Sequence, residues 1–139
     1  FEVPEKIRAV KLSPDGQYIA LWRSWAAIPD EEWRIYDRQG NLVSKRVMTP
    51  RNYDWLPDGR LVYTGPGKSL HFTAPYSTEF QSGIELPDDV PGYPSHLAVS
   101  PDGRQIAFIM ITSQTRFVVT HGTPWIMNID GSGLRQVAT

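Results

Sequence analysis

Residues 99–109 read VSPDGRQIAFI, and two other segments follow the same pattern, LSPDGQYIALW at 12–22 and WLPDGRLVYTG at 55–65. In each segment a Pro-Asp-Gly triplet is flanked by apolar residues two positions apart, which is the period of a β-strand. Pro presets φ, Asp bonds the local backbone and Gly accepts a positive φ, so the triplet itself has the chemistry of a turn. Each segment therefore predicts a β-hairpin.

The three predicted turns recur at a nearly constant spacing, because their prolines lie 43 and 44 positions apart. The structural turn residues are Pro14, Asp15, Gly16, Pro57, Asp58, Gly59, Pro101, Asp102 and Gly103. The apolar pairs repeat with them, as Val10/Leu12, Tyr53/Trp55 and Leu97/Val99 before the turn and Ile19/Leu21, Leu61/Tyr63 and Ile106/Phe108 after it. Self-similarity at a fixed period of this length indicates a repeat architecture.

A second hairpin is predicted in each repeat. Strands over 33–37 and 42–47 complete the first repeat, weaker strands at 69–74 and 84–86 the second, and strands over 126–130 and 134–138 the third. Four strands in about 40 to 45 residues is the spacing of a β-propeller blade. We therefore expect an all-β chain, a single β-propeller segment over 1–139 with blades of four antiparallel strands. Blade 1 covers about 7–47, blade 2 about 51–86 and blade 3 about 95–139.

These segments, together with WIMNIDGSGLRQVAT at 125–139, resemble the PD40 repeat, the WD40-like unit of TolB-type propellers. The resemblance runs from about residue 7 to the end and is weakest in the second half of the second repeat. It implies an exported bacterial protein, periplasmic or extracellular, that engages other envelope proteins. The same repeat also forms the propeller of prolyl-oligopeptidase-like peptidases, so it specifies the fold and leaves the function open.

Three blades are fewer than the four to eight that typically close a propeller. An open arrangement leaves sheet faces and strand edges exposed, which favours aggregation. We therefore expect an incomplete propeller, which either missing sequence or other copies of the chain complete; two copies would give six blades. The chain begins at Phe1 rather than Met, as expected of a processed product or a fragment.

Composition and charge exclude several classes of protein. The 139 residues carry 14 Lys and Arg against 15 Asp and Glu, a formal charge of −1, so no global field draws the chain onto nucleic acid or an anionic membrane. The absence of Cys excludes disulfide scaffolds, thiolate metal sites and a Cys nucleophile. The longest apolar stretch, 106–111, is far too short to span a bilayer.

The strand order predicts where a binding surface lies. Four strands that run alternately up and down place the first and third turns of a blade on one face, and the second loop and the linker to the next blade on the other. The long connections, at 23–32, 48–51, 87–95 and 112–123, all belong to that second face. Long loops on a rigid scaffold are where recognition usually occurs. The centre of 112–123 is β-branched, so this segment either forms a free loop or extends its hairpin.

The candidate partner-binding residues are the aromatic, charged and His side chains of these connections: Trp25, Asp30, Glu31, Arg51, Asp88, Asp89, Tyr93, His96, Arg116 and His121. Aromatic and Arg side chains are typical anchors of protein interfaces. In the alternative interpretation, Trp25 and Tyr93 pack beneath their own loops and the acidic residues keep the loops soluble. The expected partner is another protein or further blades, including a homo-oligomer that closes the ring, with no nucleic acid and no membrane insertion.

No catalytic, metal-binding or cofactor-binding residue is predicted. GPGKS at 65–69 would need Gly at position 62 to be a P-loop, and that residue is Val62. NIDGSG at 128–133 begins like an EF-hand loop, whose twelfth residue should be Glu but is Thr139. The three His residues lie 25 positions apart and form no local pair for a metal. No G-x-S-x-G segment is present to supply a Ser hydrolase nucleophile.

Three functions therefore remain. The first is a non-catalytic protein-interaction module whose partner docks on the face with the long connections. The second is the propeller portion of a prolyl-oligopeptidase-like serine hydrolase whose catalytic domain lies outside this chain. The third is a structural or decorating domain of a larger surface assembly.

Overall fold

The computed structural model describes residues 5–25, 28–47, 53–65, 67–75, 83–114 and 119–137. Within these residues every regular element is a β-strand. The first sheet contains β1 (Glu5–Leu12), β2 (Tyr18–Trp25), β3 (Ile28–Asp37) and β4 (Leu42–Val47). The middle sheet contains β5 (Tyr53–Trp55), β6 (Leu61–Thr64), β7 (Ser69–Thr73) and β8 (Ile84–Glu85). The third sheet contains β9 (Tyr93–Val99), β10 (Gln105–Gln114), β11 (Val119–Asn128) and β12 (Arg135–Gln136).

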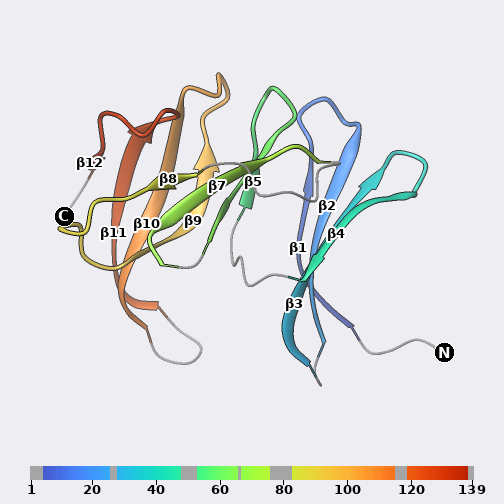
Figure 1. Cartoon of the computed structure of the whole chain (residues 1–139), viewed down its shortest axis with the longest axis horizontal. Coiled ribbons are helices and arrows are strands. Elements are labelled where there is room, and N and C mark those ends of the chain that lie inside the picture. The colour runs from blue at the N-terminus through green and yellow to red at the C-terminus, as the bar shows by residue number, and fades with distance from the viewer. Residues whose placement is uncertain are drawn as a thin grey trace.

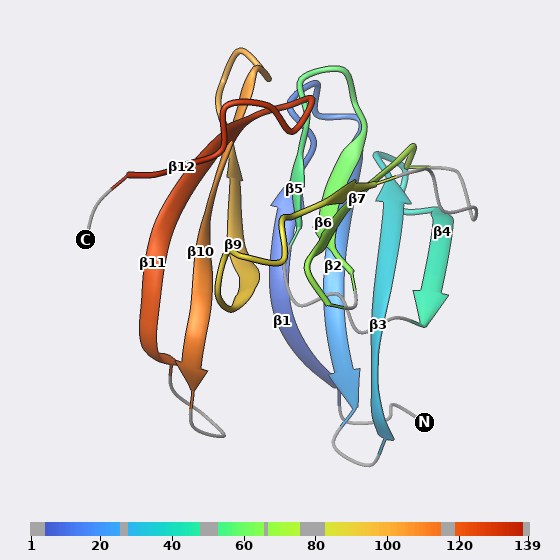
Figure 2. The same cartoon turned by 60° about the vertical axis from the view of Figure 1, so that its left-hand side comes forward.

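In each sheet, strands that follow one another in sequence are antiparallel neighbours. The middle sheet lies between the other two (Figure 1), and the first strands of the sheets contact one another in the order β1, β5, β9. Figure 2 shows β1 and β9 running upward and β2 and β10 running downward, with the Pro-Asp-Gly connections at the top. The expected all-β arrangement of three four-stranded blades, an incomplete propeller, is confirmed.

The turns between β1 and β2 and between β9 and β10 share one set of hydrogen bonds. The Ser13 hydroxyl donates to the Asp15 carboxylate over 2.7 Å, and Asp15 accepts the backbone N–H of Gln17 over 3.0 Å. Gly16 closes the turn with a φ of 72°, a conformation that glycine adopts without steric cost. Ser100 and Asp102 make the same contact over 2.7 Å. Identical sequence thus produces identical local structure in two blades.

Two hairpins are longer than predicted. The segment 23–32 was expected to be a loop, but β2 and β3 remain paired as far as Trp25 opposite Ile28. Similarly, β10 and β11 remain paired as far as Gln114 opposite Val119, so the extended-hairpin alternative holds for 112–123. Conversely, β12 spans Arg135–Gln136 where a strand over 134–138 was predicted, and residue 138 lies outside the described residues. The reason is that cross-strand pairing decides where a strand ends, and the partner's register is not a local property.

The core consists of two clusters, one in each gap between sheets. The cluster between the first and middle sheets comprises Ala20, Ile35, Tyr53, Trp55, Leu61 and Tyr63. The larger cluster between the middle and third sheets comprises Leu56, Val62, Leu70, Phe72, Leu86, Val90, Leu97, Ile106, Phe108, Met110 and Met127. Successive residues of a strand face opposite sides, so the middle sheet is covered on both faces. All four residues of β6 are therefore buried.

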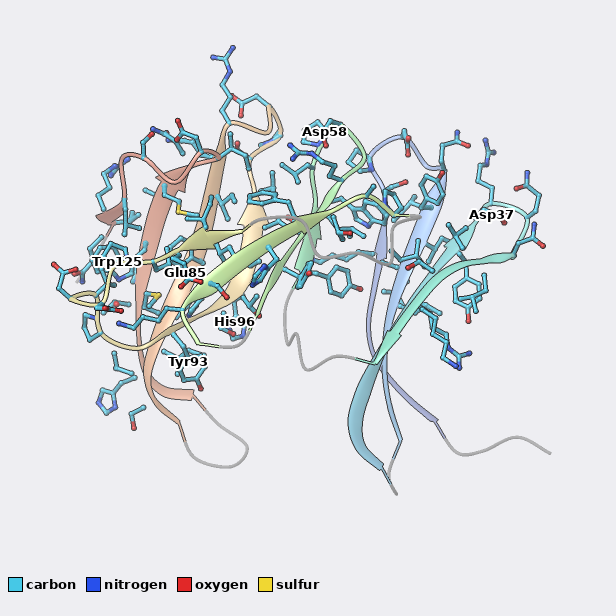
Figure 3. All side chains as sticks on the ribbon, viewed as in Figure 1. Asp37, Asp58, Glu85, Tyr93, His96 and Trp125 are labelled. Atoms are coloured by element: carbon cyan, nitrogen blue, oxygen red, sulfur yellow. The ribbon has the colours of Figure 1, made fainter. Side chains whose placement is uncertain are left out.

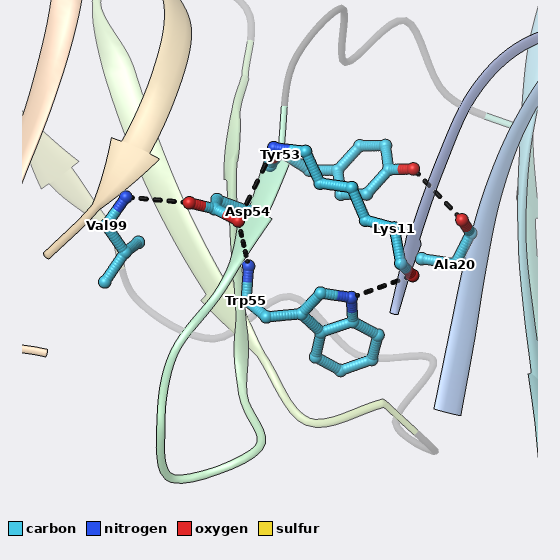
Figure 4. A network of polar contacts seen from close by, with 6 residues as sticks. All are labelled: Lys11, Ala20, Tyr53, Asp54, Trp55 and Val99. Carbon is cyan, nitrogen blue, oxygen red and sulfur yellow. Dashed lines mark hydrogen bonds and ion pairs between the residues drawn. The ribbon is translucent and has the colours of Figure 1, made fainter. Parts of the chain in front are cut away.

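A polar network joins the innermost strands of the three sheets (Figure 4). Asp54 accepts the backbone N–H groups of Trp55, over 2.8 Å, and of Val99, over 2.7 Å. The Lys11 ammonium lies 3.4 Å from the same carboxylate and donates to the Tyr53 carbonyl over 2.7 Å. One carboxylate of the middle sheet therefore links the first sheet to the third.

Candidate interaction surface

The two ends of the sheets differ in how their connections are built. The end with the Pro-Asp-Gly turns, the turn face, also has the turns that follow β3 and β11. The opposite end contains the β6–β7 connection, the linker 86–92 between β8 and β9, and the ends of the β10–β11 hairpin. Figure 3 places Asp58 at the upper end of the molecule and Tyr93 at the lower end.

The acidic residues of the turn face are engaged by their own turns. Asp15, Asp37, Asp58, Asp102 and Asp130 each accept the backbone N–H of the residue two positions later, over 2.9 to 3.0 Å. At Asp15, Asp37, Asp102 and Asp130, hydrogen bonds from neighbouring side chains and backbone N–H groups stabilise the ionised form and hold the pKa of the carboxyl group below its ordinary value. The carboxylates of this face therefore serve as turn-closing groups.

At the opposite end, hydrogen bonds from Lys68 hold the linker 86–92 against the middle sheet. Its ammonium donates to the Asp88 carbonyl over 3.0 Å and also to the Val90 carbonyl. The backbone N–H of Leu86 donates to the Lys68 carbonyl over 2.8 Å, and the side chains of Leu86 and Val90 are buried in the larger core cluster. The Asp88 and Asp89 side chains between these anchors are exposed. The linker is thus held firmly while its two carboxylates face solvent.

Gly92 brings the linker against the third sheet. It has a φ of 96°, and a Cβ at this position would lie 2.4 Å from the carbonyl oxygen of Ile111. Tyr93, which follows it, is half-buried and pairs with Ile111 in the β9–β10 ladder. On the other side of β10, the Thr112 hydroxyl donates to the His121 carbonyl over 3.4 Å, and the His121 side chain is exposed. The linker and the lower end of the third sheet therefore form one continuous surface.

We call this surface the linker face and define it by Lys68, Asp88, Asp89, Tyr93, Thr112 and His121. Among the sequence-predicted residues it contains Asp88, Asp89, Tyr93 and His121. Sequence reasoning missed Lys68, because its partners are the backbone carbonyls of residues 20 and 22 positions away. No local signal marks such a contact.

His96 lies in β9 at a β-bulge. Ala98 pairs with Ala107 and Ser95 with Ile109, so His96 and Leu97 together oppose the single residue Phe108. His96 adopts a φ of 56°, and its side chain is exposed. Bulges redirect side chains and often lie near functional sites, and a left-handed conformation at a residue other than Gly has an energetic cost of order 1 kcal/mol. The first strand of the first sheet also has a register shift, between Ile7 and Ala9.

The other predicted site residues do not join the linker face. Trp25, Asp30 and Glu31 were predicted to lie in a loop, and this was wrong, because Trp25 ends β2 and the two acidic residues belong to β3. These residues belong to the paired strands β2 and β3, in which Glu31 lies opposite Ser24. Arg51 and Arg116 lie outside the described residues.

In the described part of the chain, no group of three or more His, Asp or Glu residues is arranged to hold a metal ion. No helix there is long and apolar enough to cross a membrane. In the GPGKS segment, the ammonium of Lys68 is bound by the linker carbonyls described above.

Comparison with known proteins identifies the fold. No protein-family model and no curated protein sequence matches the chain. A solved structure of prolyl endopeptidases matches 97% of this chain and 22% of that one, with a TM-score of 0.71 and 12% identity. The β-propeller domain of Cps50 (Swd1) from Myceliophteria thermophila matches 97% of this chain and 40% of that one, with a TM-score of 0.58 and 12% identity. The β-propeller domain of the Trilobed protease from Pyrococcus furiosus matches 94% of this chain and 43% of that one, with a TM-score of 0.55 and 15% identity.

These similarities show a β-propeller fold and, at such low identity, the fold alone. The chain spans less than half the length of each of these three structures.

Proposed function

We propose that this chain is a non-catalytic protein-interaction module whose partner docks on the linker face. The observation that carries the proposal is the way the linker is held. Lys68, Leu86 and Val90 fix the linker in place, and Asp88 and Asp89 between them remain exposed. A surface that is already ordered loses little conformational entropy when it binds, so this arrangement favours recognition.

The chemistry of the linker face favours a partner with Lys or Arg side chains. Two adjacent exposed carboxylates attract cations, and the half-buried Tyr93 supplies apolar contact area beside them. The turn face offers less, because its carboxylates already accept backbone N–H groups. Regular short turns also present little irregular surface for a partner to recognise.

A pair of triple variants tests the proposal. Asp88→Ala/Asp89→Ala/Tyr93→Ala removes the exposed groups of the linker face, and Gln17→Ala/Gln39→Ala/Arg104→Ala changes three exposed residues of the turn face as the matched control. Proteins captured by the wild-type chain are identified and purified, and the affinity of each for the three forms is measured by titration calorimetry. We expect about tenfold or greater weakening with the first variant only. A partner that tolerates the first variant and loses affinity for the control would contradict the proposal.

Point substitutions are preferable to removal of 112–123. That segment includes parts of β10 and β11, which pair as far as Gln114 and Val119. A deletion would remove part of the ladder of the third sheet and would confuse loss of binding with loss of structure.

We also propose, from the resemblance to TolB-type propellers, that the protein acts in the periplasm or outside the cell. Cell fractionation of the native producer, with the chain detected by antibody, tests this localisation. Recovery in the cytoplasmic fraction would contradict it.

A second candidate function is the propeller portion of a prolyl-oligopeptidase-like hydrolase. It is favoured by the structural similarity to prolyl endopeptidases, of which this chain matches 22%. A parent reading frame with a G-x-S-x-G segment beyond Thr139 would favour this function over the first. A parent that lacks any such segment would eliminate it.

A further inference from the structure

The linker 86–92 between the second and third blades alternates buried anchors with exposed residues. The side chains of Leu86 and Val90 belong to the larger core cluster between the middle and third sheets. The residues next to these two anchors are exposed: Pro87, Asp88, Asp89 and Pro91. We call these four exposed residues the proline ridge. Because they alternate with buried anchors, they form the solvent side of a segment whose other side is packed in the core.

The backbone of the proline ridge is constrained from within. The N–H of Val90 donates to the Pro87 carbonyl over 3.2 Å and closes a turn around Asp88 and Asp89. The pyrrolidine rings of Pro87 and Pro91 fix φ on either side of this turn. A segment with these constraints presents its side chains in one arrangement before any partner arrives.

Contacts with both neighbouring sheets also hold the ridge. On the middle sheet, the Lys68 ammonium donates to the carbonyls of Asp88 and Val90. On the third sheet, Gly92 follows the ridge and lies so close to Ile111 that a Cβ would be 2.4 Å from the Ile111 carbonyl oxygen. These contacts involve the backbone of the linker, so the side chains of the ridge keep their exposed surface for a partner.

Exposed proline rings and carboxylates are complementary to two kinds of group on a partner. Proline-rich segments dock on surfaces lined with aromatic side chains, and their low conformational entropy favours binding. Carboxylates attract the side chains of Lys and Arg. In the ridge, two carboxylates lie in sequence between two proline rings. The complementary surface therefore has aromatic groups on either side of a cation.

We propose that the partner recognises the proline ridge through aromatic side chains that flank a Lys or Arg side chain, an inference that rests on the docking site proposed above. The aromatic rings pack on Pro87 and Pro91, and the cation lies against Asp88 and Asp89. Salt screens the attraction between charges and leaves apolar packing intact. The partner should therefore keep part of its affinity at high salt, where a partner bound by charge alone would lose it.

The exposed prolines of the turn face are in a different setting. Pro14 and Pro101 are each followed by one Asp, which accepts a backbone N–H of its own turn over 3.0 Å. Each of these turns therefore offers one proline ring, with no second carboxylate and no second proline next to it in the sequence. They provide matched control positions for substitutions of the ridge prolines.

Two short peptides, Ac-Trp-Arg-Trp-NH2 and Ac-Ala-Arg-Ala-NH2, test the proposed chemistry directly. Each is titrated into the isotope-labelled chain, and the backbone amide signals are followed by NMR. We expect the signals of Asp88, Asp89 and Gly92 to move, with at least about fivefold tighter binding of the tryptophan peptide. Equal affinity for the two peptides, or no movement of these signals with either one, would overturn the proposal.

Proline substitutions separate ring packing from charge. Pro87→Ala/Pro91→Ala should abolish the preference for the tryptophan peptide, whereas Pro14→Ala/Pro101→Ala should retain it. Far-UV circular dichroism verifies that both variants keep their β-structure. A preference that survives in Pro87→Ala/Pro91→Ala would mean that the aromatic rings pack elsewhere, and the proposal would be wrong.

Lys68→Met distinguishes a pre-formed ridge from an effect of charge. The substitution removes a positive charge beside the carboxylates, so attraction between charges alone predicts tighter binding of Ac-Trp-Arg-Trp-NH2. It also removes both hydrogen bonds to the linker carbonyls, and a linker that must become ordered on binding has a lower affinity. We expect the second effect to dominate, with about threefold or greater weakening and faster amide exchange at Val90. Tighter binding by Lys68→Met would contradict recognition of a pre-formed ridge.

The natural partner separates this inference from the proposed function. We expect it to lose affinity both for Asp88→Ala/Asp89→Ala/Tyr93→Ala and for Pro87→Ala/Pro91→Ala. A partner that loses affinity for the first variant but tolerates the second would overturn recognition of the prolines and leave the docking site in place. A partner that tolerates both variants would overturn the docking site as well.

Discussion

The two contacts between sheets occupy the same repeat positions but are built from different chemistry. Between the middle and third sheets the contact is apolar, with Val62 and Phe72 packed in one cluster with Leu97, Ile106 and Phe108. Between the first and middle sheets, Tyr53 and Trp55 fill the gap, and both donate hydrogen bonds to backbone carbonyls of the first sheet. Buried apolar area, which is non-directional, therefore dominates the contact between the middle and third sheets, which also has the Asp54–Val99 hydrogen bond at its inner edge. In the contact between the first and middle sheets, the aromatic side chains that fill the gap themselves make directional bonds that specify how the sheets are placed.

The largest change in the free energy of unfolding is expected from a substitution in the apolar contact between the middle and third sheets. Phe108→Ala removes a side chain that is 2% exposed, and we expect it to lower the free energy of unfolding by about 3–5 kcal/mol. Urea denaturation followed by circular dichroism measures this change. Leu42→Ala, at a position 49% exposed, is the control and should change stability by no more than about 0.5 kcal/mol. A comparable loss for both variants would mean that the contact between the middle and third sheets is not the main apolar core.

The contact between the first and middle sheets includes hydrogen bonds, so the free energy of unfolding should fall when a single hydroxyl is removed there. Tyr53→Phe keeps the ring but leaves the Ala20 carbonyl without its 3.1 Å donor, so we expect a loss of about 1–2 kcal/mol in the same denaturation experiment. Tyr18→Phe is a matched control, because the Tyr18 ring is stacked on Trp55 and keeps that contact without its hydroxyl. Equal losses for Tyr53→Phe and Tyr18→Phe would show that the Tyr53 hydroxyl has no special role.

The same hydroxyl should make stability depend on alkaline pH. Burial is the main reason that the pKa of Tyr53 is raised well above its ordinary value of 10.0, and the nearby Asp54 carboxylate raises it further. Above pH 10 the unfolded chain loses this proton while the folded chain keeps it, so stability should fall as pH rises, by at most about 1.4 kcal/mol per pH unit for one group. Thermal unfolding between pH 8 and 11 measures the slope. Tyr53→Phe should reduce the slope of stability against pH. An unchanged slope in this variant would mean that other titratable groups cause the pH dependence.

The smallest effect is expected at the ion pair of the polar network. The Lys11 ammonium and the Asp54 carboxylate lie 3.4 Å apart, with side chains 38% and 23% exposed, so solvent and salt screen their attraction. A double-mutant cycle with Lys11→Met and Asp54→Asn should yield a coupling of about 0.2–1 kcal/mol that shrinks as salt is added. A coupling independent of salt would indicate that the hydrogen bonds of Lys11 and Asp54, rather than their charges, join the sheets.

Much of the fold could be predicted from the sequence because its signals are local. A Pro-Asp-Gly triplet forms a turn through contacts within a few residues, as the bonds among Ser13, Asp15 and Gln17 show. Period-two patterning then specifies which side chains share a face. The ends of the strands could not be predicted in this way. The prediction of a loop at 23–32 was wrong because β2 and β3 stay paired there, and pairing depends on a second strand.

The linker face was predicted only in part. Asp88, Asp89, Tyr93 and His121 were identified because the sequence marks the connections that contain them. Lys68 was missed because its carbonyl partners come within reach only after the chain folds. The bulge at His96 was missed for a similar reason, since a bulge is a mismatch between two strands and neither strand shows it alone.

By itself the sequence determined the turns, the period of the strands and the repetition of one blade three times, since all three follow from neighbouring residues. Only the tertiary structure decided which of the equivalent residues are buried. Leu12 is 62% exposed and Trp55, at the same repeat position, is 4% exposed. Both continue the same apolar pattern, and the difference arises from the sheet that covers Trp55. Burial is a property of the surroundings of a side chain, and its surroundings here lie a whole repeat away in the chain.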